Sequence, residues 1–232
     1  GPAYDKARYN QTLHRIQTLA LAWFYTRDER YAAKAAQLLR VWFIDPDTRM
    51  NPNLNFASAQ PGVHDGMPIG IIEGVVLIGL FDYVKLLGTA KAWTPADDAA
   101  LRHWIAGYVA WLLESKFGQI EARAPNNHGV WYAAQVSACA LYLGERQHVR
   151  PMIEKARQFL AAEQTPEGGF TSELKRQQSL GYSIYVLMAY ATLARCGEQT
   201  GDELWHYTTA NGRSLERGVA FLAPYLSGDK TW

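Results

Sequence analysis

Apolar residues recur every three or four positions along most of the chain, which is the spacing of one helix face. No segment shows the strict alternation of a half-buried strand. Helices are therefore predicted over residues 4–25, 28–44, 67–87, 95–116, 127–143, 147–163, 179–195 and 215–225. The pattern indicates an all-α fold of about eight helices paired as antiparallel hairpins. Hairpins arranged around a central cleft form an α/α toroid, here an incomplete barrel.

Polar residues mark several helix ends. Thr94-Pro95-Ala96-Asp97 combines an N-cap residue, a proline at the first helical position and an acidic residue at the third, which together predict a helix start. Gly88 follows an apolar stripe and is expected to close its helix. Residues 118–125 are expected to be a link, after which Asn126 or Asn127 caps the next helix.

Residues 45–66 show neither period and are rich in Asn, Pro and Gly. So long a segment without regular structure is commonly functional in a compact domain. Asn55, Gln60 and His64 offer hydrogen bonds to the hydroxyl groups of a ligand. The alternative is a loop whose polar side chains hold only its own turns. The sequence does not separate these two interpretations.

A chain of 232 residues suits one domain, expected to span residues 1–232, with Gly1-Pro2 resembling the remnant of a cleaved expression tag. The balance of 23 Lys and Arg against 22 Asp and Glu argues against nucleic acid or an acidic membrane surface as partner. The most apolar run, residues 69–81, is too short to cross a bilayer. No cluster of His and Cys has ligand spacing, so no metal site is predicted.

The polar segment 124–132, Ala-Pro-Asn-Asn-His-Gly-Val-Trp-Tyr, separates two long helical regions. His128 is expected at the entrance of a helix, where the positive end of the dipole favours a neutral imidazole that can accept a proton. The alternative is a helix cap followed by a purely structural histidine. Trp131 either stacks on a sugar ring or packs in the core.

Three blocks, in order, resemble the alginate lyase family of polysaccharide lyases. They are Arg-Met-Asn-Pro-Asn-Leu-Asn-Phe at 49–56, Asn-Asn-His-Gly with Trp-Tyr at 126–132, and Glu-Leu-Lys-Arg-Gln-Gln-Ser-Leu-Gly-Tyr-Ser at 173–183. The likeness covers nearly the whole chain, although family members typically have a further N-terminal helical region that this chain lacks. It implies an α/α toroid that cleaves an anionic 1,4-linked uronic acid polymer by β-elimination, without a cofactor. Alginate is favoured, with glucuronan or another polyuronate as the alternative.

This elimination removes the C5 proton of a uronate and breaks the C4–O4 bond, so the neighbouring carboxylate must be neutralised. The resemblance implies that Asn127 and Arg176 neutralise it, and that His128 and Tyr182 transfer the protons. Each transfer by a positioned group contributes roughly 10²- to 10⁴-fold in rate. With mannuronate a single tyrosine can serve both steps, whereas with guluronate His128 acts as base and Tyr182 as acid.

Two of these catalytic candidates also have a structural alternative. Arg176 lies six residues before Tyr182, one fewer than the family spacing, so its alternative is a solvated surface arginine. Tyr182 has an alternative as a core aromatic. Arg123 is expected to contact an anion, and Glu173 to orient Arg176 or to cap a turn. With Trp131 and the loop residues named above, they complete the predicted substrate-binding set.

Two other classes of function remain open from the sequence. One is a carbohydrate-binding protein of the same fold without turnover, and the other is a helical scaffold for protein partners. The residues of segment 124–132 argue against the scaffold. Because a polyuronate is met outside the cytoplasm, a periplasmic or secreted location is expected. The oligomeric state is not indicated.

Overall fold

The structure, a computed structural model, describes residues 5–232, so the expected tag remnant at Gly1-Pro2 lies outside the described residues. The chain divides into two compact units, Gly1–Phe117 and Gly118–Trp232. The expected single domain stays a prediction. Within residues 5–232 the regular structure is helical, apart from three isolated β-bridges.

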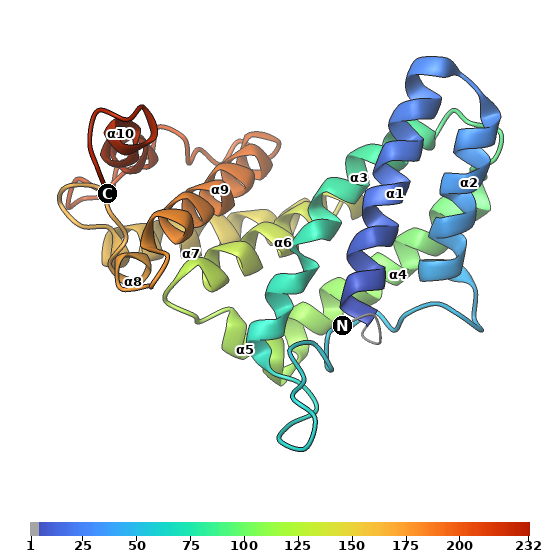
Figure 1. Ribbon diagram of the computed structural model, residues 1–232, viewed down its shortest axis with the longest axis horizontal. Helices are drawn as coiled ribbons and strands as arrows, with labels where there is room; N and C mark the ends of the chain where they lie inside the picture. Colours follow the sequence, from blue (N-terminus) through green and yellow to red (C-terminus); the bar gives the residue numbers. More distant parts are fainter. Residues whose placement is uncertain (1–4) are drawn as a thin grey trace. The chain divides into compact units, whose positions relative to one another are not determined.

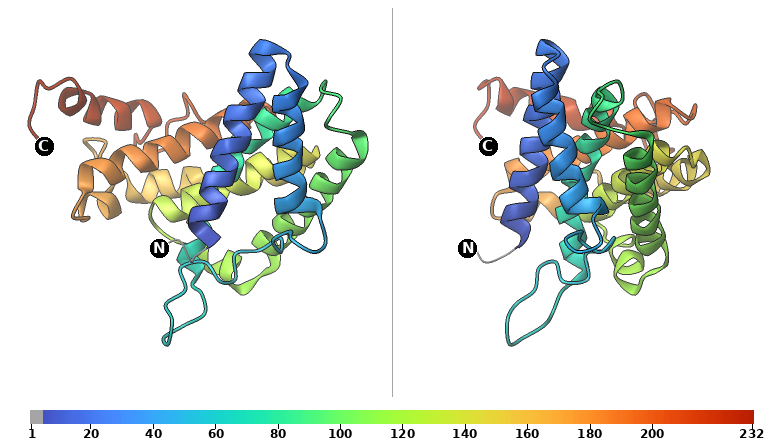
Figure 2. Two further views of the ribbon diagram at one scale, coloured as in Figure 1. Left: turned by 45° about the vertical axis from the view of Figure 1, so that its right-hand side comes forward. Right: turned by 90° about the vertical axis from the view of Figure 1, so that its right-hand side faces the viewer.

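The first unit is built on a helical hairpin and the helices that pack beside it. Its elements are α1 (Asp5–Thr26), α2 (Glu29–Leu39), the π-helical turn η1 (Arg40–Ile44), the 3-10 segment η2 (Pro68–Val75), α3 (Val76–Leu87) and α4 (Pro95–Glu114). Helices α1 and α2 lie side by side in Figures 1 and 2, and α1 also packs against α3. The carboxylate of Asp28 caps α2 by accepting from the Arg30 backbone N–H. The predicted first hairpin is confirmed.

The capping box predicted at the start of α4 is confirmed, and it is reinforced by an ion pair. Thr94 Oγ1 accepts from the Asp97 backbone N–H, and the Asp97 carboxylate accepts from the Thr94 backbone N–H. Arg40, on η1, donates to both carboxylate oxygens of Asp97 at 2.7 and 2.6 Å. The Arg40 guanidinium lowers the pKa of Asp97 to about 2, together with the hydrogen bonds that the Thr94 backbone N–H and hydroxyl donate to its carboxylate.

The second unit is organised around one buried helix. Its elements are α5 (Lys116–Glu121, which begins just before the unit), α6 (Asn127–Leu143), η3 (Arg146–His148), α7 (Val149–Glu163), α8 (Thr171–Leu174), α9 (Ser179–Glu198) and α10 (Leu215–Leu226). Helix α6 packs against both α7 and α9 (Figure 1). Nearly all of its residues are buried, as expected for a helix whose sequence has no Asp, Glu, Lys or Arg.

Several predicted boundaries were wrong. The helix expected over residues 67–87 begins as the tighter η2. Its predicted end is confirmed, since Gly88 is the C-cap residue of α3, with φ −59°. The link expected over residues 118–125 contains part of the short helix α5. The short helix α8 was not predicted. Runs of fewer than two turns carry too few positions for a period to be recognised.

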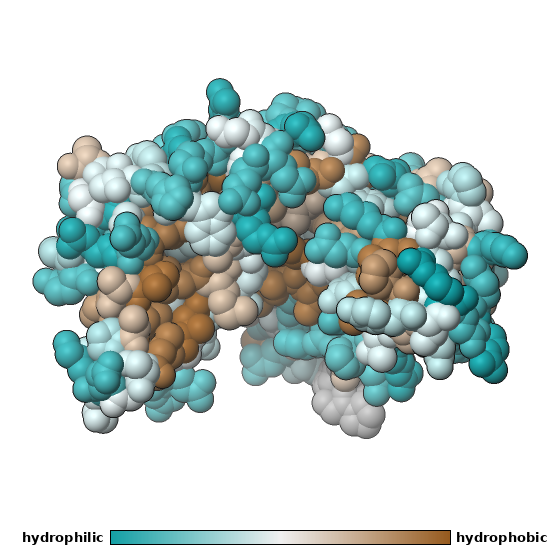
Figure 3. Space-filling view, turned by 90° about the horizontal axis from the view of Figure 1, so that it is seen from above, coloured by the Kyte–Doolittle hydropathy of each residue, from teal (hydrophilic) through white to brown (hydrophobic). Residues whose placement is uncertain are grey.

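Exposed apolar side chains occur in both units, among them Phe56, Met188 and Val219. Figure 3 shows apolar residues reaching the surface between the hydrophilic residues that cover much of one face. Among the described helices, none has the length and apolar character needed to span a bilayer.

Candidate active site

The N-terminus of α6 is a tight, capped turn. Asn126 is the N-cap residue, and its Oδ1 accepts from the His128 backbone N–H at 3.1 Å, which confirms the predicted cap. A Cβ atom at Gly129 would lie 2.2 Å from the carbonyl oxygen of Ala124 and 2.6 Å from the Phe159 ring. Because any larger residue would meet that carbonyl, glycine allows the link to pass close to the helix.

Asn127 is held by a buried carboxylate. Its backbone N–H donates to Glu173 Oε1 at 2.6 Å, and its Nδ2 donates to Oε1 and Oε2 at 3.0 and 3.1 Å. Both residues are only 1% exposed. Glu173 therefore orients the Asn127 amide, whereas the sequence had suggested that it orients Arg176 or caps a turn.

His128 is held by a second buried carboxylate. Its Nδ1 lies 2.6 Å from Oε1 of Glu121, the last residue of α5. The Glu121 side chain is 3% exposed, and the His128 side chain is 18% exposed. Sequence reasoning missed Glu121. Seven residues separate the pair, but the chain leaves α5 and turns between them, so helical spacing gives no signal.

The turn between Glu121 and Asn126 is fixed by its own backbone and by α7. The Ala124 backbone N–H donates to the Glu121 carbonyl oxygen at 3.0 Å. Lys155 Nζ, from α7, donates to the Ala122 carbonyl oxygen at 2.6 Å. Burial, with the charge of Arg123 as a second cause, lowers the pKa of Lys155. Arg123 is exposed, so this turn presents a cationic side chain to solvent.

Arg176 and Tyr182 lie together. The guanidinium carbon of Arg176 is 4.1 Å from the centroid of the Tyr182 ring, within the range of a cation–π contact. The Arg176 backbone N–H donates to the Glu173 carbonyl oxygen at 3.0 Å. Direct contacts therefore connect Asn127, Glu173, Arg176 and Tyr182, so three of the four predicted catalytic residues belong to one set of contacts. The fourth, His128, follows Asn127 in the chain.

Trp131 lies on α6, one turn after His128, and is 4% exposed. Its ring packs against Tyr185 of α9, with 5.0 Å between centroids. Of the two interpretations left open by the sequence, packing in the core describes Trp131. Burial, with Tyr182 as a smaller cause, raises the pKa of Tyr185.

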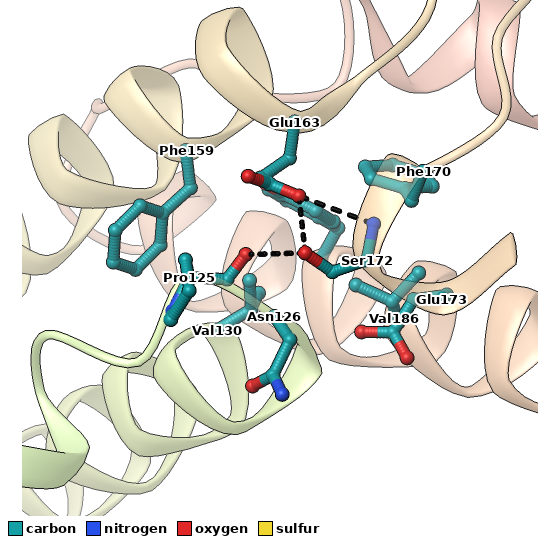
Figure 4. A pocket seen from close by; sticks show the side chains of 10 residues that line it. Pro125, Asn126, Val130, Phe159, Glu163, Phe170, Ser172, Glu173 and Val186 are labelled. Carbon is teal, nitrogen blue, oxygen red and sulfur yellow. Dashed lines mark hydrogen bonds between the residues drawn. The ribbon is translucent and has the colours of Figure 1, made fainter. Parts of the chain in front are cut away.

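A small cavity lies next to the turn that precedes α6, at Pro125 and Asn126. Its volume of about 10 Å³ is close to that of a single water probe, so no sugar ring fits into it. Figure 4 shows Ser172 of α8 bonded to the Glu163 carboxylate, while the Glu173 carboxylate lies apart from that pair. A substrate of the size of a sugar would have to meet the exposed edges of His128, Arg176 and Tyr182 instead.

The predicted loop residues belong to the first unit. The Trp111 Nε1–H donates to Asn55 Oδ1 at 3.0 Å. Gln60 and His64 exchange backbone hydrogen bonds of 3.0 and 3.1 Å around a short turn. Their contacts to a substrate stay predictions.

The same unit holds an open cleft of about 1220 Å³. One wall comes from residues 5–10 of α1 and another from residues 48–51 and 53–54 of the long loop, with Trp42 and Glu73 also lining it.

Among residues 5–232 no group of three or more His, Cys, Asp or Glu side chains is arranged to hold a metal ion.

Comparison with known proteins gives consistent results. The family model described as alginate lyase matches residues 3–232. A crystal structure of an alginate lyase from Bacteroides ovatus matches with a TM-score of 0.92 and 32% identity, over 96% of this chain and 59% of that one. A complex of alginate lyase A1-III with a tetrasaccharide matches with a TM-score of 0.71 and 14% identity, over 98% of this chain and 63% of that one.

The present chain thus spans less than two thirds of the length of either solved structure. No curated protein matches it. The all-helical structure and the two fold matches confirm the predicted α/α toroid class.

Proposed function

Because the chain belongs to the alginate lyase family, we propose that it cleaves alginate or another 1,4-linked polyuronate by β-elimination. One observation carries the proposal. Two adjacent polar residues, Asn127 and His128, are each hydrogen-bonded to a different buried carboxylate. The carboxylate that holds Asn127 belongs to Glu173, whose carbonyl oxygen accepts from Arg176, and the Arg176 guanidinium lies over the Tyr182 ring. The solved structures it resembles are described as alginate lyases, one of them with a bound tetrasaccharide.

The first requirement is to neutralise the uronate carboxylate, since only then is the C5 proton acidic enough to be removed. An amide nitrogen carries two N–H donors. In the structure the Asn127 Nδ2 donates to both Glu173 oxygens and the residue is 1% exposed, so this role requires one amide N–H to turn from Glu173 to the substrate carboxylate when the substrate binds. The guanidinium of Arg176, which is exposed, supplies the positive charge.

The second requirement is a base and an acid. The base takes the proton as the C5–H bond breaks, the electron pair forms the C4–C5 double bond, and the C4–O4 bond breaks as O4 takes a proton. Tyr182 donates the proton to O4. His128 takes the C5 proton where the two groups lie on opposite faces of the sugar, as in guluronate. In mannuronate both lie on one face, so Tyr182 can serve both steps.

The substrate proposed is an anionic polysaccharide, and exposed cationic groups would attract it. Arg123 lies two residues after Glu121 and presents such a charge. Asn55, Gln60 and His64 are proposed to bond its hydroxyl groups. A polymer of this kind is met outside the cytoplasm, so we place the protein in the periplasm or outside the cell.

The test is to incubate the protein with polymannuronate, polyguluronate and glucuronan, and to follow the ultraviolet absorbance of the unsaturated product. A rise with one polymer identifies the substrate, and Tyr182→Phe should abolish it. Tyr185→Phe is the matched control, because Tyr185 lies one turn further along α9 and contacts Trp131. It should retain most of the activity.

A flat trace on all three polymers would contradict the proposal for these substrates. Binding of the oligosaccharides without turnover would then favour a carbohydrate-binding protein of the same fold.

A further inference from the structure

We propose that Glu121 is a positioning residue that fixes the tautomer of His128, so that Nε2 is the atom that accepts the substrate's proton. The catalytic consequence of this inference rests on the proposed function, whereas the spectroscopic test of the tautomer does not. Neither the sequence pattern nor the resemblance pointed to Glu121.

The hydrogen bond between Glu121 and His128 is short and shielded from water. The 2.6 Å separation of Glu121 Oε1 and His128 Nδ1 is slightly shorter than the usual charge-assisted N–H···O bond of about 2.7–2.9 Å. Because the Glu121 side chain is 3% exposed, water competes little for its oxygen. A hydrogen bond in such surroundings is electrostatically stronger than in water.

The chemistry of the two groups determines where the proton lies. An ionised carboxylate only accepts hydrogen bonds, so Nδ1 must carry the hydrogen in this contact. A neutral imidazole has one hydrogen, which leaves the lone pair on Nε2. The opposite tautomer would carry its hydrogen on Nε2, which could then accept nothing from C5. The His128 side chain stays 18% exposed, so part of it is open to solvent.

The carboxylate is itself held in place. Glu121 ends α5, and its carbonyl oxygen accepts from the Ala124 backbone N–H. The next residue, Ala122, is tied to α7 through Lys155. On the histidine side, the backbone N–H of His128 is bonded to the Asn126 cap. Since both ends are fixed, the bond sets the orientation of the ring as well as its tautomer.

Nuclear magnetic resonance of protein with ¹⁵N-labelled histidine tests the inference directly, because protonated and unprotonated ring nitrogens have well-separated shifts. His128→Ala identifies the signals of His128. We expect the neutral ring of the wild type to carry its hydrogen on Nδ1. In Glu121→Gln the new amide both donates and accepts, so the tautomer preference should be lost. Glu163→Gln is the matched control: it removes another carboxylate of the same unit, bonded to Ser172, and should leave the His128 signals unchanged.

The second measurement is the steady-state kinetics on a polymer that the wild type cleaves and on which His128→Ala loses activity. Glu121→Gln should lower kcat by roughly tenfold or more, and by no more than the loss in His128→Ala, with KM little changed. In the His128→Ala background the same change should have no further effect, because Glu121 acts through the ring. A purely structural role would lower activity in both backgrounds.

A wild-type ring with its hydrogen on Nε2, or an unchanged tautomer in Glu121→Gln, would overturn the inference. The spectra need no turnover. Failure of the lyase assay would therefore contradict the proposed function while leaving the tautomer decided by the spectra alone.

Discussion

The guanidinium of Arg176 lies over the ring of Tyr182, 4.1 Å from its centroid. The resemblance to the family led us to expect one more residue between the two, and on a helix one residue corresponds to a rotation of about 100°. Arg176, however, lies in the turn between α8 and α9, before α9 begins at Ser179. A turn can absorb a missing residue without rotating a helix face, so the shorter spacing is compatible with the contact.

Removing this contact should affect catalysis more than folding. Arg176 is exposed and its side chain lies on one ring, so Arg176→Ala should change stability by less than about 1 kcal/mol. The kcat/KM on the cleaved polymer should fall by roughly a hundredfold, because the charge that neutralises the uronate carboxylate is lost. Arg176→Lys keeps the charge without the planar fork and should fall between the two. Equal activity of the alanine variant and the wild type would remove Arg176 from the mechanism.

The bond between Glu173 and Asn127 leads to a different expectation. The carboxylate accepts from the backbone N–H and the amide of Asn127, and a glutamine would turn an N–H toward one of these donors. Glu173→Gln should therefore lower the free energy of unfolding by about 1–3 kcal/mol and lower kcat as well. Thermal unfolding and the ultraviolet assay measure the two effects. An unchanged melting temperature would indicate that this buried carboxylate contributes nothing to the turn.

The sequence predicted the long helices and the cap at Asn126 because these depend on local spacing and local chemistry. It also placed His128 at a helix entrance, since a polar segment before an apolar run stands out. The catalytic role of Asn127 came from the resemblance to the family. The sequence could not assign the partners. Glu173 lies 46 residues from Asn127, and which side chain a buried carboxylate meets depends on the packing of α8 against the start of α6. Glu121 was missed because a turn, which has no period, brings it back to His128.

The pair of Asp97 and Arg40 predicts how the stability of the first unit depends on pH. Because the pKa of Asp97 is lowered from 3.8 to about 2, the folded state favours the ionised form. The stabilisation is fully present above the unfolded pKa, near pH 4, and is lost as the pH falls toward 2. It amounts to about 2 kcal/mol by linkage.

Asp97→Asn should therefore destabilise the protein at pH 6, and the difference from the wild type should shrink between pH 4 and pH 2. Urea unfolding at a series of pH values measures it. Asp98→Asn is the control, because the Asp98 pair with Arg102 is half exposed and should contribute little. A wild-type advantage that stayed constant down to pH 2 would show that the ion pair is not its source.

Two glycine substitutions should have opposite effects. Alanine at Gly129 would place its Cβ 2.2 Å from the Ala124 carbonyl oxygen, which is backbone and cannot turn aside. At Gly181, in α9, the added Cβ meets nothing within 4 Å. Alanine is favoured over glycine in a helix by about 1 kcal/mol, so Gly181→Ala should raise the free energy of unfolding. Gly129→Ala should lower it by about 1–3 kcal/mol, because the clash outweighs the same gain.

The glycine pair also tests whether the turn that carries His128 depends on this close approach. If it does, Gly129→Ala should reduce lyase activity along with stability, since the link between Glu121 and Asn126 must move to make room. Chemical denaturation of both variants gives the stabilities, and the histidine spectrum shows whether the contact to Glu121 survives. A Gly129→Ala protein as stable as Gly181→Ala, with an unchanged spectrum, would mean that the link does not pass as close to α6 as the 2.2 Å approach requires.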